Sequence, residues 1–108
     1  MAGRIERGDV RLHLFAPPDK RRPVLVISRK EAIDVISTVM VAPITSTVRG
    51  LPSEVTLDLS DGMKGFCAIN LDHVQTVRKG DLSKRVAVLG STKMAAVCRA
   101  LSVAVGCS

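Results

Sequence analysis

The chain has 108 residues, 46% of them hydrophobic but only 2% aromatic, and its 16 basic and 10 acidic residues give a formal net charge of +6. This length fits a single domain spanning 1–108, and its core must be aliphatic because Trp and Tyr are absent and only two Phe occur. No stretch has the length and apolarity of a membrane span or of a secretory signal, so we expect a cytoplasmic protein that does not associate with membranes.

Charge and cysteine content indicate which ligands and cofactors the protein could bind. The positive charge favours a polyanion such as nucleic acid, although a basic surface that only aids solubility has the same composition. The cysteines are odd in number and lack C-x-x-C spacing, which indicates neither a disulfide framework nor a zinc site. We therefore expect no metal and no cofactor, and Cys67 and Cys98 are predicted to be small buried hydrophobes.

Short strands dominate the pattern along the chain. Alternating polar and apolar residues predict a half-buried strand over 10–15, and two prolines place a loop at 16–20. The apolar run 24–27 is typical of a strand covered on both faces, and Ser28 is predicted to cap one helical turn that follows it. Further strands are expected at 38–45, 54–59 and 86–89, with a tight turn at 60–62, and the segments 66–69 and 74–77 are expected to form two short strands or one bent strand.

The apolar period changes to that of a helix from Ser91, the expected N-cap, to Gly106, the expected end. Apolar residues occupy most sides of this helix, so we expect it to be covered by its own domain and by a second subunit, in a homodimer. The predicted fold is mostly β, a small SH3-like antiparallel barrel with a C-terminal α-helix and a short helical insert.

Arg7-Gly8-Asp9 resembles the cell-adhesion tripeptide, but adhesion requires an exposed loop on a secreted protein. Here the three residues open a predicted strand. We interpret them as structural and expect Asp9 to pair with a nearby basic side chain.

Two polar features at strand ends are the candidate active-site residues. Arg22 precedes Pro23, which favours an extended backbone at a strand entrance, and Thr45-Ser46-Thr47 ends another strand. Because side chains alternate along a strand, Thr45 and Thr47 are predicted to share one face and Ser46 to lie on the other. Taken singly, the arginine would be an ordinary surface residue and the hydroxyls ordinary turn formers.

Together with their flanking residues, these features resemble the MazF/PemK toxins in four blocks that agree in order and spacing. The blocks are Arg7-Gly8-Asp9-Val10, Arg22-Pro23-Val24-Leu25-Val26, residues 41–55 (VAPITSTVRGLPSEV), and residues 70–77 (NLDHVQTV) with the closing strand and helix at 82–106. The loop at 16–21 is shorter than in many members, and His73 and Gln75 stand where many carry Gln and then Arg.

The resemblance implies an SH3-like barrel homodimer that is the toxin of a type II toxin–antitoxin pair. It implies a metal-independent endoribonuclease that cleaves single-stranded RNA at short sequences, leaves 2′,3′-cyclic phosphate and 5′-hydroxyl ends, and so inhibits translation and growth. The family's catalytic arginine and threonine fall on Arg22 and Thr45. The implied neutralising partner is a labile, acidic, MazE-like antitoxin whose extended tail lies across the RNA groove.

The chemistry of the residues limits their roles. Arginine side chains have a pKa above ~12, so serving as the base near neutrality would cost about 7 kcal/mol. We therefore expect Arg22 to stabilise the phosphorane oxygens, and Thr45 to donate a hydrogen bond to a non-bridging oxygen. His13 and His73 belong to the residue type suited to proton transfer, but each is equally consistent with a surface or interface histidine.

RNA contacts are expected from residues around this pair. Single-strand readers usually stack bases on aromatic rings, and this chain has few. The predicted RNA-binding residues are Arg11, Phe15, Arg21, Ser46, Thr47, Arg49, His73 and Gln75.

Two other functions remain open from the sequence. A related barrel family poisons DNA gyrase through the tip of its C-terminal helix and would not need Arg22 beside Thr45. A nucleic-acid-binding barrel without catalysis explains the charge equally well, but gives no reason to pair a guanidinium with a hydroxyl.

Overall fold

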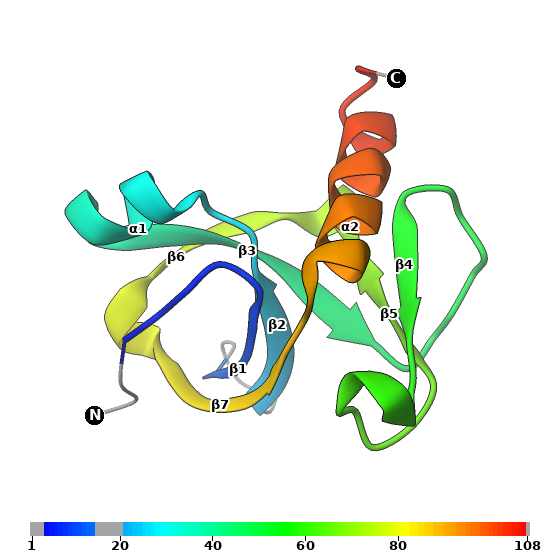
Figure 1. Cartoon of the computed structure of the whole chain (residues 1–108), viewed down its shortest axis with the longest axis horizontal. Helices are drawn as coiled ribbons and strands as arrows, with labels where there is room; N and C mark the ends of the chain where they lie inside the picture. The colour runs from blue at the N-terminus through cyan, green and yellow to red at the C-terminus, as the bar shows by residue number, and fades with distance from the viewer. Residues whose placement is uncertain (1–3, 15–20, 108) are drawn as a thin grey trace.

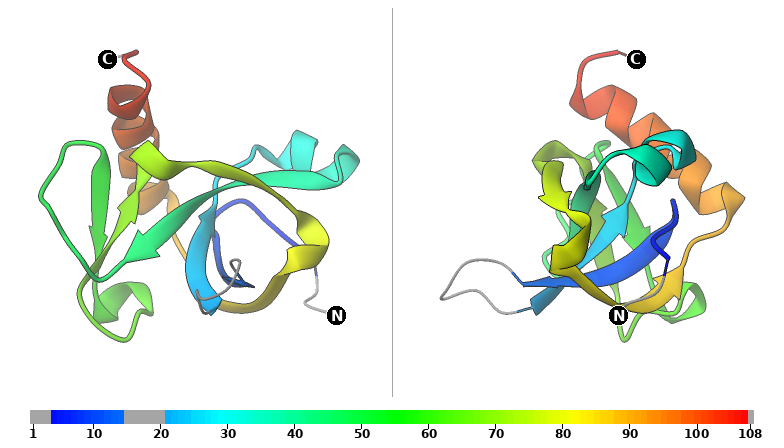
Figure 2. Two further views of the ribbon diagram at one scale, coloured as in Figure 1. Left: turned by 180° about the vertical axis from the view of Figure 1, so that it is seen from behind. Right: turned by 90° about the vertical axis from the view of Figure 1, so that its left-hand side faces the viewer.

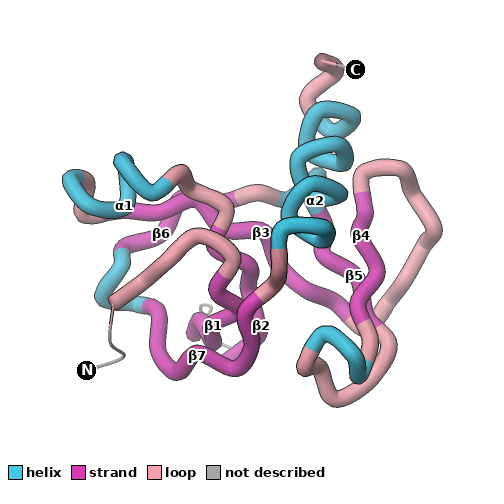
Figure 3. Tube along the Cα trace, in the orientation of Figure 1, coloured by secondary structure: helices cyan, strands magenta, loops and turns pink. Residues whose placement is uncertain are grey.

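Seven strands and two α-helices make up the computed structural model, which describes residues 4–14 and 21–107. The strands and α-helices in chain order are β1 (Asp9–Leu14), β2 (Arg21–Val26), α1 (Lys30–Val35), β3 (Thr38–Thr45), β4 (Glu54–Leu57), β5 (Cys67–Asn70), β6 (Gln75–Arg78), β7 (Leu82–Val88) and α2 (Ser91–Ala104). Three 3-10 helices, η1 (Leu59–Asp61), η2 (Leu71–His73) and η3 (Lys79–Asp81), join some of the strands. The mostly β composition with one long C-terminal helix is as predicted (Figure 3).

The strands form one antiparallel sheet in the order β4-β5-β3-β2-β1-β7, with β6 paired to β3 outside this path. Strand β3 connects the whole arrangement, because its first half pairs with β6, its middle with β2 and its end with β5. The sheet curves around the interior as in a barrel, but its path runs from β4 to β7 without closing (Figures 1 and 2). Helix α2 packs against β4 and η2.

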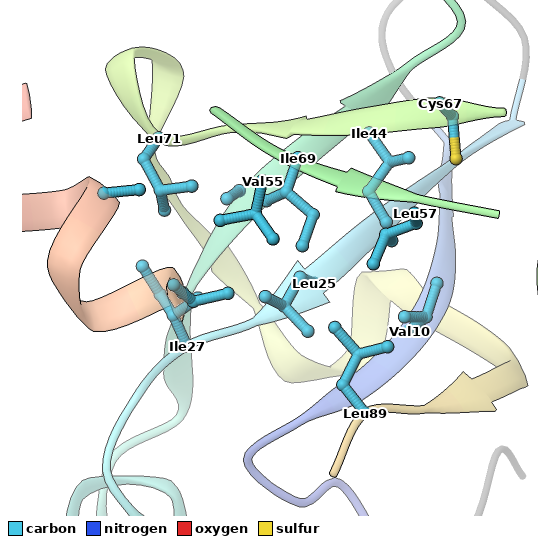
Figure 4. Close-up of a cluster of buried hydrophobic side chains, with 13 residues drawn as sticks. Val10, Leu25, Ile27, Ile44, Val55, Leu57, Cys67, Ile69, Leu71 and Leu89 are labelled. Carbon is cyan, nitrogen blue, oxygen red and sulfur yellow. The ribbon is translucent and has the colours of Figure 1, made fainter. Parts of the chain in front are cut away.

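Strand β2 is covered on both faces, as its apolar run predicted. Leu25 and the adjoining Ile27 belong to the larger hydrophobic cluster (Figure 4). Val97 and Ala100 of α2 belong to the same cluster. Val24 and Val26 point to the opposite face and join a second cluster, which includes Ile33 of α1.

Strand β1 differs from its prediction. The alternation of polar and apolar residues indicated a half-buried strand, but Arg11 and His13 are 1% and 8% exposed. Arg11 Nε donates to Asp9 Oδ2 at 3.0 Å, and the guanidinium also donates to the Ser83 and Arg4 carbonyl oxygens. A charge that is paired and hydrogen-bonded can be buried, which a pattern of residue types does not reveal.

The Arg7-Gly8-Asp9 tripeptide is structural, as predicted. Gly8 has a φ of +93°, donates to the Val26 carbonyl at 3.0 Å and accepts from the Leu89 N–H at 2.9 Å. A Cβ at this position would lie 3.2 Å from the Leu89 oxygen. Both this close approach and the positive φ require glycine. Asp9 pairs with Arg11 as expected of a nearby basic side chain.

Several helix predictions need correction. Ser28 does not cap α1: Arg29 holds the N-cap position, and Ser28 Oγ instead accepts from the Met40 N–H at 2.7 Å. Helix α2 begins at Ser91 with Gly90 at the N-cap, while Gly106, at a φ of +76°, lies beyond its end as predicted.

Cys67 is buried but Cys98 is exposed, so the prediction of a buried Cys98 was wrong. No helix in the described part of the chain is both long and apolar enough to span a membrane.

Candidate active site

Arg22 and Thr45 meet because of the register between β2 and β3. The two strands pair Val26 with Val41, Leu25 with Ala42 and Val24 with Pro43. Continuing this antiparallel register by two residues sets Arg22 opposite Thr45 at the end of the ladder. Both residues line the same two hollows, so the structure brings together the two side chains that the sequence analysis paired.

Two hollows share this pair and differ in the rest of their lining residues. The first, of about 300 Å³ and here termed the Phe66 hollow, has Ser46, Lys64 and Phe66 in its wall beside Arg22 and Thr45. The second, of about 240 Å³ and here termed the His73 hollow, adds Thr47, Arg49, Glu54, Asn70 and His73 to the same pair. Thr47 and Ser46 fall into different hollows, as the predicted alternation of side chains requires.

The local chemistry of the pair suits an anionic ligand. Arg22 is exposed, and none of the described acidic side chains forms an ion pair with it. Thr45 is half-buried, and its Oγ1 accepts a hydrogen bond from the Thr47 N–H at 3.1 Å. That bond fixes the oxygen and leaves the hydroxyl proton available for a ligand oxygen.

Glu54 shapes the wall of the His73 hollow at the start of β4. Its Oε1 accepts from the backbone N–H groups of Arg49 and Leu51 at 3.1 and 3.2 Å. These bonds hold the 49–51 turn while the Arg49 side chain remains exposed. The carboxylate is thus engaged by backbone donors, and the guanidinium of Arg49 is presented to the rim of the hollow.

Polar contacts of Asp72, the residue before His73, hold η2 in place. Asn70 Oδ1 accepts from the Asp72 N–H at 2.9 Å, and the buried Ser53 hydroxyl donates to Asp72 Oδ2. The exposed His73 imidazole at the end of η2 lies in the same hollow as Arg22 and Thr45. It is therefore the histidine that a bound substrate can reach.

His13 has a different environment. It is the cross-strand partner of Arg22 in the β1–β2 ladder, so the two side chains leave the same face of the sheet. Its side chain is nevertheless buried, which differs from the surface or interface position considered for it.

The predictions for the remaining RNA-binding residues fall into three groups when compared with the structure. The structure contradicts the prediction for Arg11, because its guanidinium is buried beside Asp9 and cannot reach a ligand in solvent. Arg21 and Gln75 are exposed, on β2 and β6, but line neither hollow. Phe15 and the loop at 16–20 lie outside the described residues.

The structure adds residues that the sequence analysis did not select. Phe66 and Lys64 line the Phe66 hollow, and Glu54 and Asn70 line the other. Phe66 was taken as part of an apolar strand over 66–69, but β5 begins only at Cys67. The glycine before Phe66 was the one signal that could have placed it in a loop.

The thiol beside the pair is not suited to be a nucleophile. Cys67 lines the Phe66 hollow, and burial, with smaller contributions from Asp61 and Asp58, raises the pKa of its thiol. A thiol with a raised pKa stays protonated near neutrality and does not supply the reactive thiolate. The described residues also contain no group of three or more His, Cys, Asp and Glu placed to hold a metal ion.

Comparison with known proteins gives consistent results for sequence and for structure. Residues 6–105 match the family model described as "PemK-like, MazF-like toxin of type II toxin-antitoxin system". The chain is 47% identical over 89 residues to "Probable endoribonuclease MazF5" of Mycobacterium tuberculosis, covering 82% of each protein.

Solved structures share the fold. The chain superposes on "Mycobacterium tuberculosis toxin MazF-mt6" with a TM-score of 0.83 and 31% identity, covering 93% of this chain and 98% of the other. A MazE-MazF crystal structure from Deinococcus radiodurans gives a TM-score of 0.81 at 27% identity, with 97% and 99% of the two chains covered.

Proposed function

Because the chain belongs to the PemK-like, MazF-like family of toxins of type II toxin–antitoxin systems, we propose that it is an endoribonuclease that cleaves single-stranded RNA at the Arg22–Thr45 pair. The proposed reaction needs no metal and leaves 2′,3′-cyclic phosphate and 5′-hydroxyl ends. Its result in the cell is inhibition of translation and growth.

One observation carries the proposal: a guanidinium without an ion-pair partner among the described residues lies beside a fixed threonine hydroxyl, between two hollows. A phosphodiester that bridges two nucleotides places one nucleotide on each side of its phosphorus. With the phosphate at the pair, we assign one flanking nucleotide to each of the two hollows that share the pair.

The roles of the two residues follow from the charge that develops in the reaction. The 2′-oxygen attacks phosphorus while the bond to the 5′-oxygen breaks, and negative charge grows on the non-bridging oxygens. The planar fork of Arg22 donates to two such oxygens, and Thr45 donates its hydroxyl proton to one. Donors placed where charge develops are commonly worth 10²–10³-fold in rate each.

Proton transfer needs further groups. The 2′-hydroxyl must lose a proton and the leaving 5′-oxygen must gain one. A histidine is the side-chain type suited to both near neutral pH, and His73 lies in one of the hollows that contain the pair. We assign it to proton transfer at that side of the phosphate, directly or through one water molecule.

Arg49 and Thr47 complete the His73 hollow as RNA contacts, and Ser46 contributes to the other. Arg21 and Gln75 are assigned to the RNA strand beyond the hollows, because both are exposed. Their charge and polarity suit contacts to the RNA backbone.

A toxin of this family implies an antitoxin. We propose that the partner is an acidic protein whose extended segment occupies the two hollows, since the chain carries a net charge of +6 and the site itself binds a polyanion. A second copy of this chain is also proposed as a partner, because the apolar residues Val103 and Val105 at the end of α2 are exposed.

The two competing functions receive less support. The relatives that match are named endoribonucleases, not gyrase inhibitors. A barrel that only binds RNA gives no role to a fixed hydroxyl beside a guanidinium.

The first experiment incubates the purified protein with a long unstructured RNA in EDTA and maps each cut and its ends. The variants Arg22→Ala and Thr45→Ala are run beside it. The matched controls are Arg99→Ala and Thr76→Ala, which remove an exposed arginine on α2 and an exposed threonine on β6. Cuts at one short sequence with cyclic-phosphate ends, lost in the first two variants and kept in the controls, support the proposal. RNA that stays intact contradicts it.

A further inference from the structure

Phe66 is a large aromatic side chain in an unusual place. It is 63% exposed, and it lines the hollow that also contains Arg22 and Thr45. No other Phe, Tyr or Trp lies among the described residues. Single exposed apolar side chains are common on protein surfaces, but this ring lines the hollow of Arg22 and Thr45, where a ligand with an apolar face would cover it.

The backbone around Phe66 holds the ring in position. The next residue, Cys67, is buried and pairs with Leu57 across the β4–β5 ladder. Cys67 belongs to the large hydrophobic cluster and also lines the Phe66 hollow, so Phe66 lies where the chain passes from the surface into the core.

The segment that leads to Phe66 is anchored as well. Asp58 caps η1 by accepting from the Ser60 N–H at 2.8 Å, and the Met63 N–H donates to the Asp58 carbonyl at 3.3 Å. Gly62 ends η1 with a φ of +89°. Because the backbone is anchored before Phe66 at 58–63 and after it in β5, this segment loses less conformational entropy than a free loop when a ligand binds.

The charged side chains that line the Phe66 hollow, Arg22 and Lys64, are basic. Lys64 lines the Phe66 hollow and also a third hollow of about 520 Å³, where Lys84 and Arg85 of β7 add further positive charge. The two hollows share Pro23, Met63 and Lys64, so one basic surface continues from the Arg22–Thr45 pair past Phe66. An aromatic ring within a basic groove is the arrangement that holds single-stranded nucleic acid by stacking and charge together.

We propose that Phe66 is the stacking platform for the RNA base next to the cleaved phosphate, on the side of the Arg22–Thr45 pair opposite His73. The inference rests on the proposed function and assigns an RNA subsite to the Phe66 hollow, with Lys64 at the adjoining phosphate. Stacking tolerates any base, so Phe66 contributes affinity and alignment and leaves the choice of cleavage sequence largely to other residues.

The test measures binding of a short RNA that contains the mapped cleavage sequence. A single 2′-deoxynucleotide replaces the nucleotide whose 2′-hydroxyl attacks, so the RNA binds without being cut. Phe66→Ala and Phe66→Leu should each weaken binding about 5- to 100-fold, because both remove the ring while Leu keeps apolar volume. Phe66→Trp should bind as well as the original chain or better.

Abasic substitutions then locate the stacked base. Each nucleotide that flanks the cut is replaced by an abasic one in turn. At the position stacked on Phe66, the abasic RNA should bind the original chain as weakly as intact RNA binds Phe66→Ala, and combining the two changes should cost nothing more.

Fluorescence gives an independent measurement, because the chain contains no Trp or Tyr. In Phe66→Trp the single tryptophan should be quenched when RNA binds. The control is Val35→Trp at an 82% exposed position of α1, whose emission should not change.

Two outcomes would overturn the inference. Equal RNA affinity of Phe66→Ala, Phe66→Leu and the original chain, in a protein that still cuts RNA, removes the stacking role and leaves the proposed function in place. A change in oligomeric state of Phe66→Ala, measured by sedimentation, with abasic effects that simply add to it, would instead make Phe66 a subunit-interface residue.

Discussion

Arg11 and Arg22 lie on neighbouring paired strands, and their environments are opposite. Arg11 on β1 is 1% exposed and bonds to Asp9 and to the backbone carbonyls of Arg4 and of Ser83, which is 72 residues away. Arg22 on β2 is exposed beside Thr45, and no ion-pair partner is found for it among the described residues. One guanidinium holds parts of the fold together, and the other is available to a ligand.

The difference shows that charge alone does not identify a binding residue. A buried arginine needs its pairing carboxylate and carbonyls, so its removal affects stability. An exposed arginine at a strand end contributes little to stability, so its contribution lies in what it binds. The two residues should therefore respond differently to substitution.

Arg11→Met should have the largest effect, on folding. The substitution keeps much of the side-chain volume but removes the closest cation of the 1% exposed Asp9 carboxylate, which then retains, among the described residues, only the Arg85 guanidinium at 4.0 Å and the Glu6 N–H at 3.1 Å. We expect the free energy of unfolding to fall by about 3–5 kcal/mol, measured by urea denaturation.

The double variant Asp9→Asn/Arg11→Met tests the cause of that loss. Because it removes the uncompensated charge, it should be more stable than Arg11→Met alone. The exposed-site control Arg99→Met should change stability by no more than about 0.5 kcal/mol. A loss in Arg11→Met as small as in this control would show that the buried pair does not hold β1 and β7 together.

Arg22→Lys should have the next largest effect, on catalysis. The charge is kept, but a single ammonium cannot donate to two phosphorane oxygens as the planar fork does. We expect kcat to fall about 10²–10³-fold with a smaller change in KM, measured in steady-state cleavage of a short RNA. The unfolding free energy should stay within about 0.5 kcal/mol of the original chain. Full activity in Arg22→Lys would mean that only charge is required at this position.

Arg49→Ala should have the smallest effect, on RNA affinity. The exposed side chain lies at the rim of the His73 hollow, where its contact to RNA is expected to be with a phosphate. We expect about fivefold weaker binding, and a slope of log affinity against log salt concentration that is smaller by about 0.7. An unchanged salt slope would place Arg49 outside the RNA path.

The sequence predicted most strands because apolar runs and turn residues record local preferences. Thr38–Thr45 was obtained to the residue, and β2 was correctly expected to be covered on both faces. Strand β4 ended earlier than expected, because Asp58 leaves the strand to cap η1. Local signals of this kind can be read from neighbouring residues alone.

The burial of Arg11 could not be predicted in the same way. Its partners include Ser83, 72 residues away, and a pattern of polar and apolar residues contains no information about such a contact. The role of Ser28 was missed for a similar reason, since its hydroxyl binds a residue of the next strand and not the helix it precedes.

The candidate site was predicted in part. Arg22, Thr45 and His73 could be selected through the family resemblance, and the β2–β3 register explains why the first two converge. Phe66 could not be selected, because an aromatic residue beside an apolar run has the same local signature whether it faces the core or the solvent. Only its position relative to Arg22 in three dimensions separates the two cases.

The pairing of β1 with β7 has a consequence for how the protein is made. Strand β1 is synthesised before its partner β7, so a nascent chain that stops before residue 82 lacks the strand that pairs with β1 and supplies the Ser83 carbonyl to Arg11. Contacts between such distant segments form late in folding, because the entropy of closing a long loop must be overcome first. This domain therefore reaches its complete fold only after β7, at Leu82–Val88, has been synthesised, which delays completion of the Arg22–Thr45 site until then.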